Sequence, residues 1–202
     1  MSFQADFTAV LSEDAAILEA IGDGSHSLAV WRRAHFPDIE ALFAFEAANI
    51  RIRCEARGAG DPFREALLEK GYREGPELDA LVADVADLTV RFASASGTER
   101  IKVRLERVST NSCRKFHADY TTMRLITTYR GPGTEWIEGA DLGRVAAGEE
   151  PLTIHALASG DIGIFKGRLL VDEPAILHRS PPIADLDIER LLLVIDPADD
   201  AQ

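Results

Sequence analysis

The chain has 202 residues, the size of one ordinary domain with a single core. Its composition, 46% hydrophobic and 28% charged, lies in the range of globular proteins and excludes a disordered or fibrous class. A formal net charge of -12 argues against nucleic acid as the main partner, because such binding depends on Lys and Arg that neutralise phosphates.

The N-terminal segment and the two cysteines indicate the compartment. Residues 1–18 hold no basic segment ahead of an apolar run, and acidic residues stand where a secretory signal would be uncharged, so we expect a cytoplasmic protein. No apolar stretch approaches the ~20 residues of a bilayer crossing, so we expect no membrane span. Cys54 and Cys113 lack CxxC spacing and are expected to be reduced thiols. Nothing in the pattern indicates an oligomeric state.

The first half of the chain, residues 1–98, is expected to form a mainly helical flank. Apolar residues recur there at helical spacing, and Gly or Pro residues separate the segments. The predicted helices cover residues 6–21, a stretch that begins near residue 37, residues 61–70 and residues 77–95. Two segments rich in strand formers lie between them, at residues 27–33 and 49–57. These helices carry no obvious chemistry.

The second half, residues 99–202, changes character. Short apolar or alternating runs follow one another, separated by Gly, Pro and Asp: IKVRLERV, TMRLITTY, LTIHALA, IGIFKG, AILH and RLLLVID. A succession of strands without helical patterns between them predicts a sandwich or barrel of antiparallel strands, for which a jelly roll is one standard solution. We therefore expect a single α+β domain over residues 1–202.

Two histidines and one aspartate form a candidate metal site. His117 and Asp119 lie in FHADY, and the one residue between them puts both side chains on the same face of an extended segment. His178 lies in AILHRSPP, on a late strand that can return beside an early one in an antiparallel barrel. Two imidazoles and one carboxylate leave the opposite coordination positions free, as in non-haem Fe(II) oxygenases. Zinc also accepts these ligands, and Cys113 would favour zinc if it took part.

The order of these motifs carries two resemblances. The series FHADY, GDIGIF, LHRSPP and RLLLVID resembles the Fe(II)/2-oxoglutarate dioxygenase superfamily, in which a Gly-Asp strand, the distal His and a following basic residue recur in that order. This implies a cupin-like double-stranded β-helix, or jelly roll, in the C-terminal half. More narrowly, FHADYTTMRLITTYRGPGTEW with LHRSPP and AVWRR resembles the bacterial family of unknown function numbered 1826. That resemblance implies the fold and a metal site, but no reaction or substrate.

The superfamily resemblance also implies a binding site for 2-oxoglutarate. In these dioxygenases an Arg or Lys about ten residues after the distal His holds the far carboxylate of the co-substrate, and Arg190 stands at the matching position. A planar guanidinium suits this task because it can donate two parallel hydrogen bonds to a carboxylate. Arg124 and Arg179 are the rival anchors, although Arg179 alternates away from His178 on a strand. The hydroxyls of Thr127 and Tyr129, which share a strand face, are candidates to assist, with packing as the competing interpretation.

The loop RGPGTEW follows the same strand directly. Its Gly-Pro-Gly segment is typical of a turn. If that turn lies at the barrel mouth, Thr134, Glu135 and Trp136 are candidates to line a substrate pocket.

Two functions of different class follow from this site. The first is an Fe(II)/2-oxoglutarate-dependent dioxygenase that hydroxylates or oxidises a small molecule or a peptide, which the acidic composition favours over nucleic acid. The alternative is a non-redox, cupin-like metal-binding protein that handles zinc without 2-oxoglutarate. The direction of the Arg190 side chain distinguishes them, because only the oxygenase needs it to point into the barrel.

Overall fold

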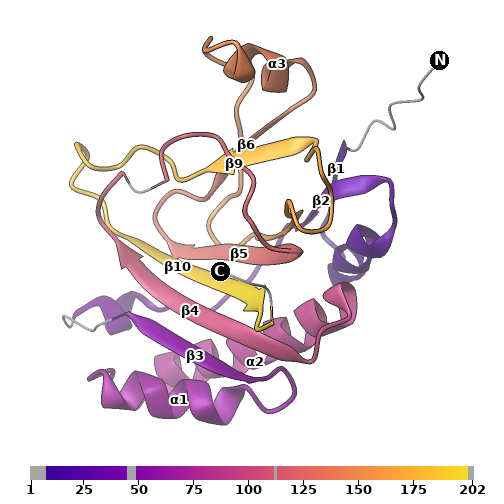
Figure 1. Ribbon diagram of the computed structural model, residues 1–202. Helices are drawn as coiled ribbons and strands as arrows, with labels where there is room; N and C mark the ends of the chain where they lie inside the picture. The colour runs from indigo at the N-terminus through magenta and orange to yellow at the C-terminus, as the bar shows by residue number, and fades with distance from the viewer. Residues whose placement is uncertain (1–7, 45–48, 112, 200–202) are drawn as a thin grey trace.

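The computed structural model describes residues 8–44, 49–111 and 113–199, and it contains two sheets (Figure 1). The large sheet has seven strands in the order β1 (Thr8–Ser12), β2 (His26–Trp31), β8 (Ile162–Lys166), β5 (Met123–Arg130), β10 (Arg190–Pro197), β4 (Arg100–Val108) and β3 (Ile50–Glu55). The small sheet has three, in the order β7 (His155–Ala156), β6 (Glu135–Glu138) and β9 (Ile176–Arg179). Every strand pair is antiparallel except β1 with β2.

From β4 onward, with the extended segment at His117 counted, the chain crosses between the two sheets at every step except from β6 to β7, which both lie in the small sheet. β4, β5, β8 and β10 lie side by side in the large sheet, whereas β6, β7 and β9 form the small one. The segment at His117 joins the small sheet through an isolated antiparallel bridge to His178 of β9. Eight consecutive extended segments therefore form two facing layers.

Helices cover the outer face of the large sheet (Figure 1). These are α1 (Gly60–Glu69) and α2 (Pro76–Ser96), accompanied by the 3-10 helices η1 (Ala15–Gly22) and η2 (Glu40–Ala44); α3 (Ala140–Ala146) follows β6. The sequence defines α2 at both ends, because Pro76 occupies its first turn and Gly97, with φ of 70°, ends it in the left-handed conformation. Its buried residues Leu81, Leu88 and Phe92 belong to the main hydrophobic core.

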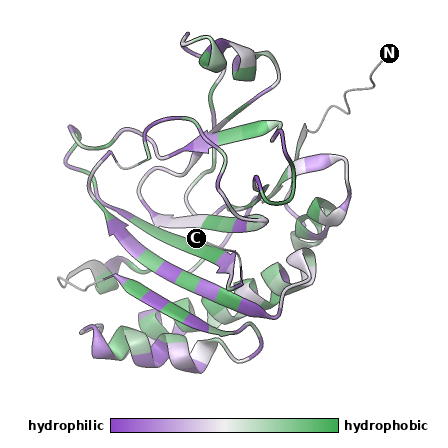
Figure 2. Ribbon diagram, viewed as in Figure 1, coloured by the Kyte–Doolittle hydropathy of each residue, from purple (hydrophilic) through white to green (hydrophobic). Residues whose placement is uncertain are grey.

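Alternation along the strands gives the large sheet two different faces. Figure 2 shows hydrophobic and hydrophilic residues alternating along β3 and β4. In β4, Val103 and Leu105 pack in the main core with the helices, while Arg104 and Glu106 face the space beside the small sheet. A second apolar cluster lies between the sheets and consists of Leu28, Val30, Ile126, Trp136, Leu157, Phe165 and Ile176. The polar half of the inter-sheet space holds the candidate site.

The expected α+β class, with a sheet-rich core, is confirmed, and so are the strands at β2 and β3 and the helices α1 and α2. The expected helix over residues 6–21 is wrong: within its described part the chain forms β1, which pairs with β2, and then the 3-10 helix η1. In place of the second expected helix the chain forms only the short 3-10 helix η2. The side chain of Phe43, within that segment, lies outside what the structure describes. The N-terminal half is consequently more than a helical flank, because it supplies β1, β2 and β3 to the large sheet. Among the described residues, no helix is both long and apolar enough to cross a membrane.

Candidate metal centre

Backbone pairing brings the two histidines of the candidate site together. The backbone N–H of His117 donates to the carbonyl of His178 at 2.9 Å, and the N–H of His178 donates back to the carbonyl of His117 at 2.8 Å. Residues opposite each other in such a bridge direct their side chains to the same side of the sheet. Their ring centroids are accordingly 4.8 Å apart.

Asp119 directs its carboxylate toward both rings. Its Oδ1 lies 3.5 Å from His117 Nε2, and its Oδ2 lies 3.0 Å from His178 Nε2. One ligand atom from each of the three residues falls within 4.8 Å of the others. The structure therefore assembles the predicted triad of His117, Asp119 and His178 at one point.

The polar atoms of the triad fit a cation. Asp119 Oδ2 is buried and, despite its closeness to His178, has no partner with hydrogen-bond geometry among the described residues. His117 Nδ1 lies 2.9 Å from the carbonyl of Lys115, a contact in which the ring donates and which leaves the Nε2 lone pair free. Two imidazoles with one carboxylate suit Fe(II) or zinc, so the residues present fit such a metal.

The pKa values of the three residues favour forms that bind metal. Burial opposes ionisation of Asp119, but contacts with both histidines and the charge of Arg124 outweigh it and hold the pKa of this carboxyl well below its ordinary value. Burial lowers the pKa of His178, which favours the neutral imidazole. The hydrogen bond with Asp119 raises the pKa of His117, so a proton competes with metal at that ring.

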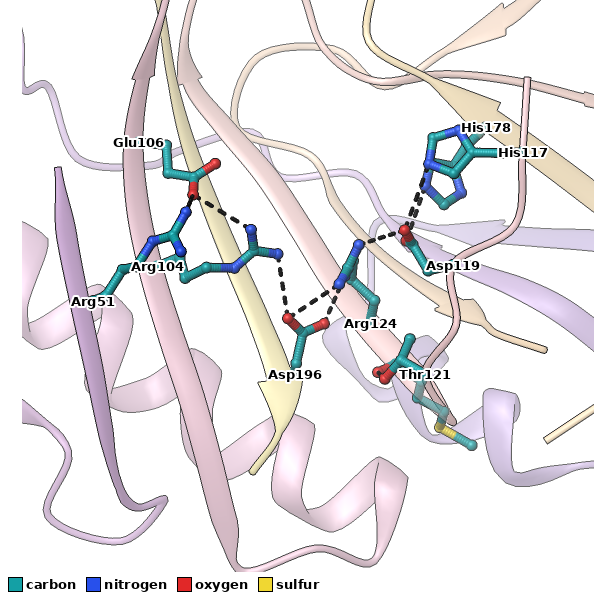
Figure 3. A network of polar contacts seen from close by, with 10 residues as sticks. Arg51, Arg104, Glu106, His117, Asp119, Thr121, Arg124, His178 and Asp196 are labelled. Atoms are coloured by element: carbon teal, nitrogen blue, oxygen red, sulfur yellow. Dashed lines mark hydrogen bonds and ion pairs between the residues drawn. The ribbon is translucent and has the colours of Figure 1, made fainter. Parts of the chain in front are cut away.

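Arg124 holds the other oxygen of Asp119 (Figure 3). Its Nη1 lies 2.5 Å from Asp119 Oδ1, while its Nε and Nη2 contact the two oxygens of Asp196 at 2.6 and 3.2 Å. Arg104 Nη2 also contacts Asp196, at 3.2 Å. Arg124 therefore fixes the orientation of Asp119, whose Oδ2 faces His178.

The chain of ion pairs continues across the sheet, and the sequence reasoning did not find it. Arg104 Nη1 lies 3.3 Å from Glu106, and Arg51 of β3 lies 3.0 Å from the same carboxylate. The sequence predicts Arg124 only as a rival anchor for the co-substrate. Strand alternation was the one available signal, since the register between β3, β4, β10 and β5 is set by distant parts of the chain.

Arg190 lies on the inner face of β10 and is fully buried. Its Nε donates to the carbonyl of Pro132 at 2.6 Å, and its Nη1 and Nη2 lie 3.3 Å from the hydroxyls of Ser180 and Thr128, respectively. Burial lowers its pKa to about 10. The rival Arg179 is engaged elsewhere, with Glu135 at 2.6 Å and with the ring of Phe116. The strand alternation could have identified Thr128, which shares a face with Arg124.

Thr127 and Tyr129 do not meet the expectation that they assist a bound carboxylate. Both lie on the face of β5 opposite Arg124, and Thr127 pairs with Leu193 and Ile162 of the main core. The Tyr129 hydroxyl donates to Asp84 of α2 at 2.5 Å. Because side chains alternate along a strand, they point toward the helices and away from the triad.

The residues after the Gly-Pro-Gly turn are divided between different environments. A cavity of about 110 Å³ opens beside the triad, and Thr134, Ser180, Ile126 and Leu192 are among its lining residues. Glu135 pairs with Arg179 instead. Trp136 packs in the cluster between the sheets and stacks on His155, and its buried indole Nε1 has no hydrogen-bond partner in the part of the chain that the structure describes. Of the three predicted substrate residues, only Thr134 lines this cavity.

Solved structures share the fold at low sequence identity. The rice dioxygenase for auxin oxidation is 13% identical with a TM-score of 0.55, over 96% of this chain and 84% of that chain. The Arabidopsis thaliana dioxygenase for auxin oxidation 1, in complex with 2-oxoglutarate, is 10% identical with a TM-score of 0.50, over 97% of this chain and 95% of that chain. These likenesses show a common fold.

The sequence itself matches one family. No curated protein matches the chain. Residues 12–196 match the family described as "Protein of unknown function (DUF1826)", a match that covers nearly the whole chain. The chain therefore belongs to the DUF1826 family of proteins of unknown function.

Proposed function

We propose that this chain is an Fe(II)- and 2-oxoglutarate-dependent oxygenase that acts on a small molecule or a peptide. The observation that carries the proposal is the triad of His117, Asp119 and His178, accompanied on the inner face of the same barrel by the buried Arg190. The metal would bind to three residues, and the arginine would bind the far end of the co-substrate.

The topology supports this assignment. Eight extended segments are divided between two facing sheets, four in each, and the chain crosses between the sheets at every step except from β6 to β7. This is the pattern of a jelly roll and, in our interpretation, of the double-stranded β-helix. The barrel combines strands from both halves of the chain, with β4 to β10 as its main part. The fold shared with the auxin dioxygenases, one of which was solved with 2-oxoglutarate, agrees with this interpretation.

The residues of the chain would bind the metal, orient the co-substrate and exclude water from the site. His117 Nε2, Asp119 Oδ2 and His178 Nε2 would hold the metal and leave other coordination positions free. When bound, iron and 2-oxoglutarate supply the oxidation chemistry. Phe165, whose ring centroid is 4.8 Å from that of His178, and the cluster between the sheets keep one side of the site apolar.

Arg190 supports the co-substrate part of the proposal. A guanidinium has five N–H groups, and three of its nitrogens have protein partners here: Pro132, Ser180 and Thr128. The two hydroxyls would accompany Arg190 in binding a carboxylate, because each can donate as well as accept. Ser180 and Thr128 thus give the buried Arg190 two polar neighbours with which it would bind the carboxylate.

A second candidate, non-redox zinc binding, is favoured by one observation. The cavity beside the triad measures about 110 Å³, below the roughly 300–1,000 Å³ of usual ligand pockets. The guanidinium of Arg190 is already hydrogen-bonded within the protein. Both facts suit a protein that binds a metal alone.

One titration tests the two candidates. Anaerobic protein loaded with Fe(II) is expected to develop a weak visible absorption band when 2-oxoglutarate is added, and Arg190→Gln is expected to require at least roughly tenfold more co-substrate, because it removes the charge-assisted hydrogen bonds. His178→Ala is expected to abolish metal binding, with His35→Ala, an exposed histidine, as the matched control. One bound iron without a band would contradict the oxygenase and support the zinc candidate. Unchanged metal content in His178→Ala would contradict both.

A further inference from the structure

A hollow lined by cations adjoins the metal pocket. It measures about 320 Å³, and its lining residues are Arg51, Ile52, Arg53, Lys102 and Arg104. Arg104 also lines the cavity beside the triad, so the two spaces are neighbours. The hollow lies over β3 and β4, at the edge of the large sheet.

The register of β3 and β4 explains why the cations gather. Arg51 lies opposite Arg104, and Arg53 lies opposite Lys102, so all four side chains share one face of the sheet. This is the face on which Arg104, Asp196 and Arg124 lead to Asp119 (Figure 3). The opposite face packs in the main core. The cations therefore lie on the side of the metal site.

One cation of the hollow, Arg53, is available to a ligand without competition from a described carboxylate. Glu106 contacts both Arg51 and Arg104. Asp196 contacts Arg104 but is shared with Arg124. Arg53 has no ion pair with any described residue, and no carboxylate of the described ranges lines the hollow. A chain of net charge -12 thus gathers four cationic side chains beside its candidate metal site.

The other side of the pocket has the same character. A hollow of about 390 Å³ is lined by Asn111, Cys113, Arg114, Lys115 and His117, and the described residues place no carboxylate in its lining. Cys113 and His117 also line the cavity beside the triad. A ligand that enters the pocket from either side therefore passes cationic residues.

We propose that the substrate is an elongated organic anion, whose carboxylate or phosphate group binds over Arg51, Arg53, Lys102 and Arg104 while its reacting end lies at the triad. This inference rests on the proposed function. Guanidinium groups bind both kinds of oxyanion by paired hydrogen bonds. Neighbouring strands lie about 4.8 Å apart, so the two to three strand steps from Arg124 to Arg104 and Arg51 span roughly 10–15 Å. The acidic group would lie about that far from the oxidised atom.

The test measures anion binding without any metal. Metal-free protein is titrated with inorganic phosphate and, separately, with acetate at constant ionic strength, while amide resonances are followed by NMR. We expect saturable shifts in β3 and β4. Arg53→Gln is expected to weaken binding several-fold and Arg53→Gln/Lys102→Gln at least tenfold, whereas Arg32→Gln, which removes an exposed arginine elsewhere, is expected to change nothing.

Each outcome decides the inference. Stronger binding of phosphate would support a phosphate group on the substrate, and stronger binding of acetate a carboxylate. Shifts that do not saturate, or that persist equally in Arg53→Gln and in the double variant, would overturn the proposal. Arg53 is exposed, so its single variant keeps the test valid if the double variant fails to fold. Failure of the Fe(II) titration alone would instead overturn the proposed function.

Discussion

At the scale of single residues, the orientation of Asp119 is the feature that most directly controls the site. Arg124 binds one carboxylate oxygen, and the other accepts no hydrogen bond from any residue that the structure describes. Asp196 contacts Arg124 through both of its oxygens, so the guanidinium is itself fixed. An arginine in this place keeps the carboxylate ionised and binds Oδ1, so Oδ2 is the oxygen that would hold a metal.

Arg124→Gln is accordingly expected to weaken metal binding by about 10–100-fold, the usual range for residues that orient a ligand. The dissociation constant for Zn(II), measured by competition with a chelator at fixed pH, checks this. Arg124→Lys is expected to recover part of the affinity, because it restores a positive charge without the fork geometry. Equal metal affinity in wild type and Arg124→Gln would contradict the role assigned to Arg124, provided that both proteins are folded by circular dichroism.

At the scale of elements, β5 separates two functions on its two faces. Arg124, Ile126 and Thr128 face the space between the sheets, while Tyr129 and Thr127 face the helices. Tyr129 and Arg33 both contact Asp84, so one polar cluster joins α2 to β5. The strand therefore lies between the helical layer and the site, and each of these side chains faces only one of the two.

Tyr129→Phe tests this division. The variant loses a buried hydrogen bond to a carboxylate, which we expect to lower the free energy of unfolding by about 1.5–3 kcal/mol. Denaturant unfolding measures that loss. The affinities for Zn(II) and 2-oxoglutarate are expected to stay at the wild-type values, because the hydroxyl points away from the triad. A large loss of 2-oxoglutarate affinity in a stable variant would return Tyr129 to the site.

The triad, α2, β5 and β1 show which features the sequence can predict and which it cannot. The sequence could predict the triad because HxD spacing and motif order are local. It could predict α2 because the apolar period of this helix spans 21 residues between clear end signals. The sequence could not predict which face of β5 Thr127 and Tyr129 occupy, because a shift of register by one residue moves every side chain of a strand to the opposite face. Residues 8–12 form a strand only because β2 pairs with them. Tertiary pairing of this kind leaves little local signal.

At the scale of the whole molecule, the triad joins segments that are distant in the sequence. His117 belongs to the segment between β4 and β5, and His178 belongs to β9 of the small sheet. A metal that binds all three residues would close this part of the barrel and would bind the native state alone. By linkage, binding then adds to the stability of the whole fold.

Removal of the metal is therefore expected to lower the stability of the whole fold. At a free metal concentration 100 times the dissociation constant, binding contributes about 2.7 kcal/mol, and about 2–4 °C per kcal/mol for a chain of this size gives a decrease of roughly 5–10 °C in Tm on chelation. Calorimetry with and without EDTA measures the difference. His178→Ala is expected to show no change on chelation, while His35→Ala is expected to behave as wild type. If chelation left the Tm of wild-type protein unchanged although metal had been bound, the metal would have to lie outside this triad, because an ion held by His117, Asp119 and His178 cannot bind the native barrel without stabilising it.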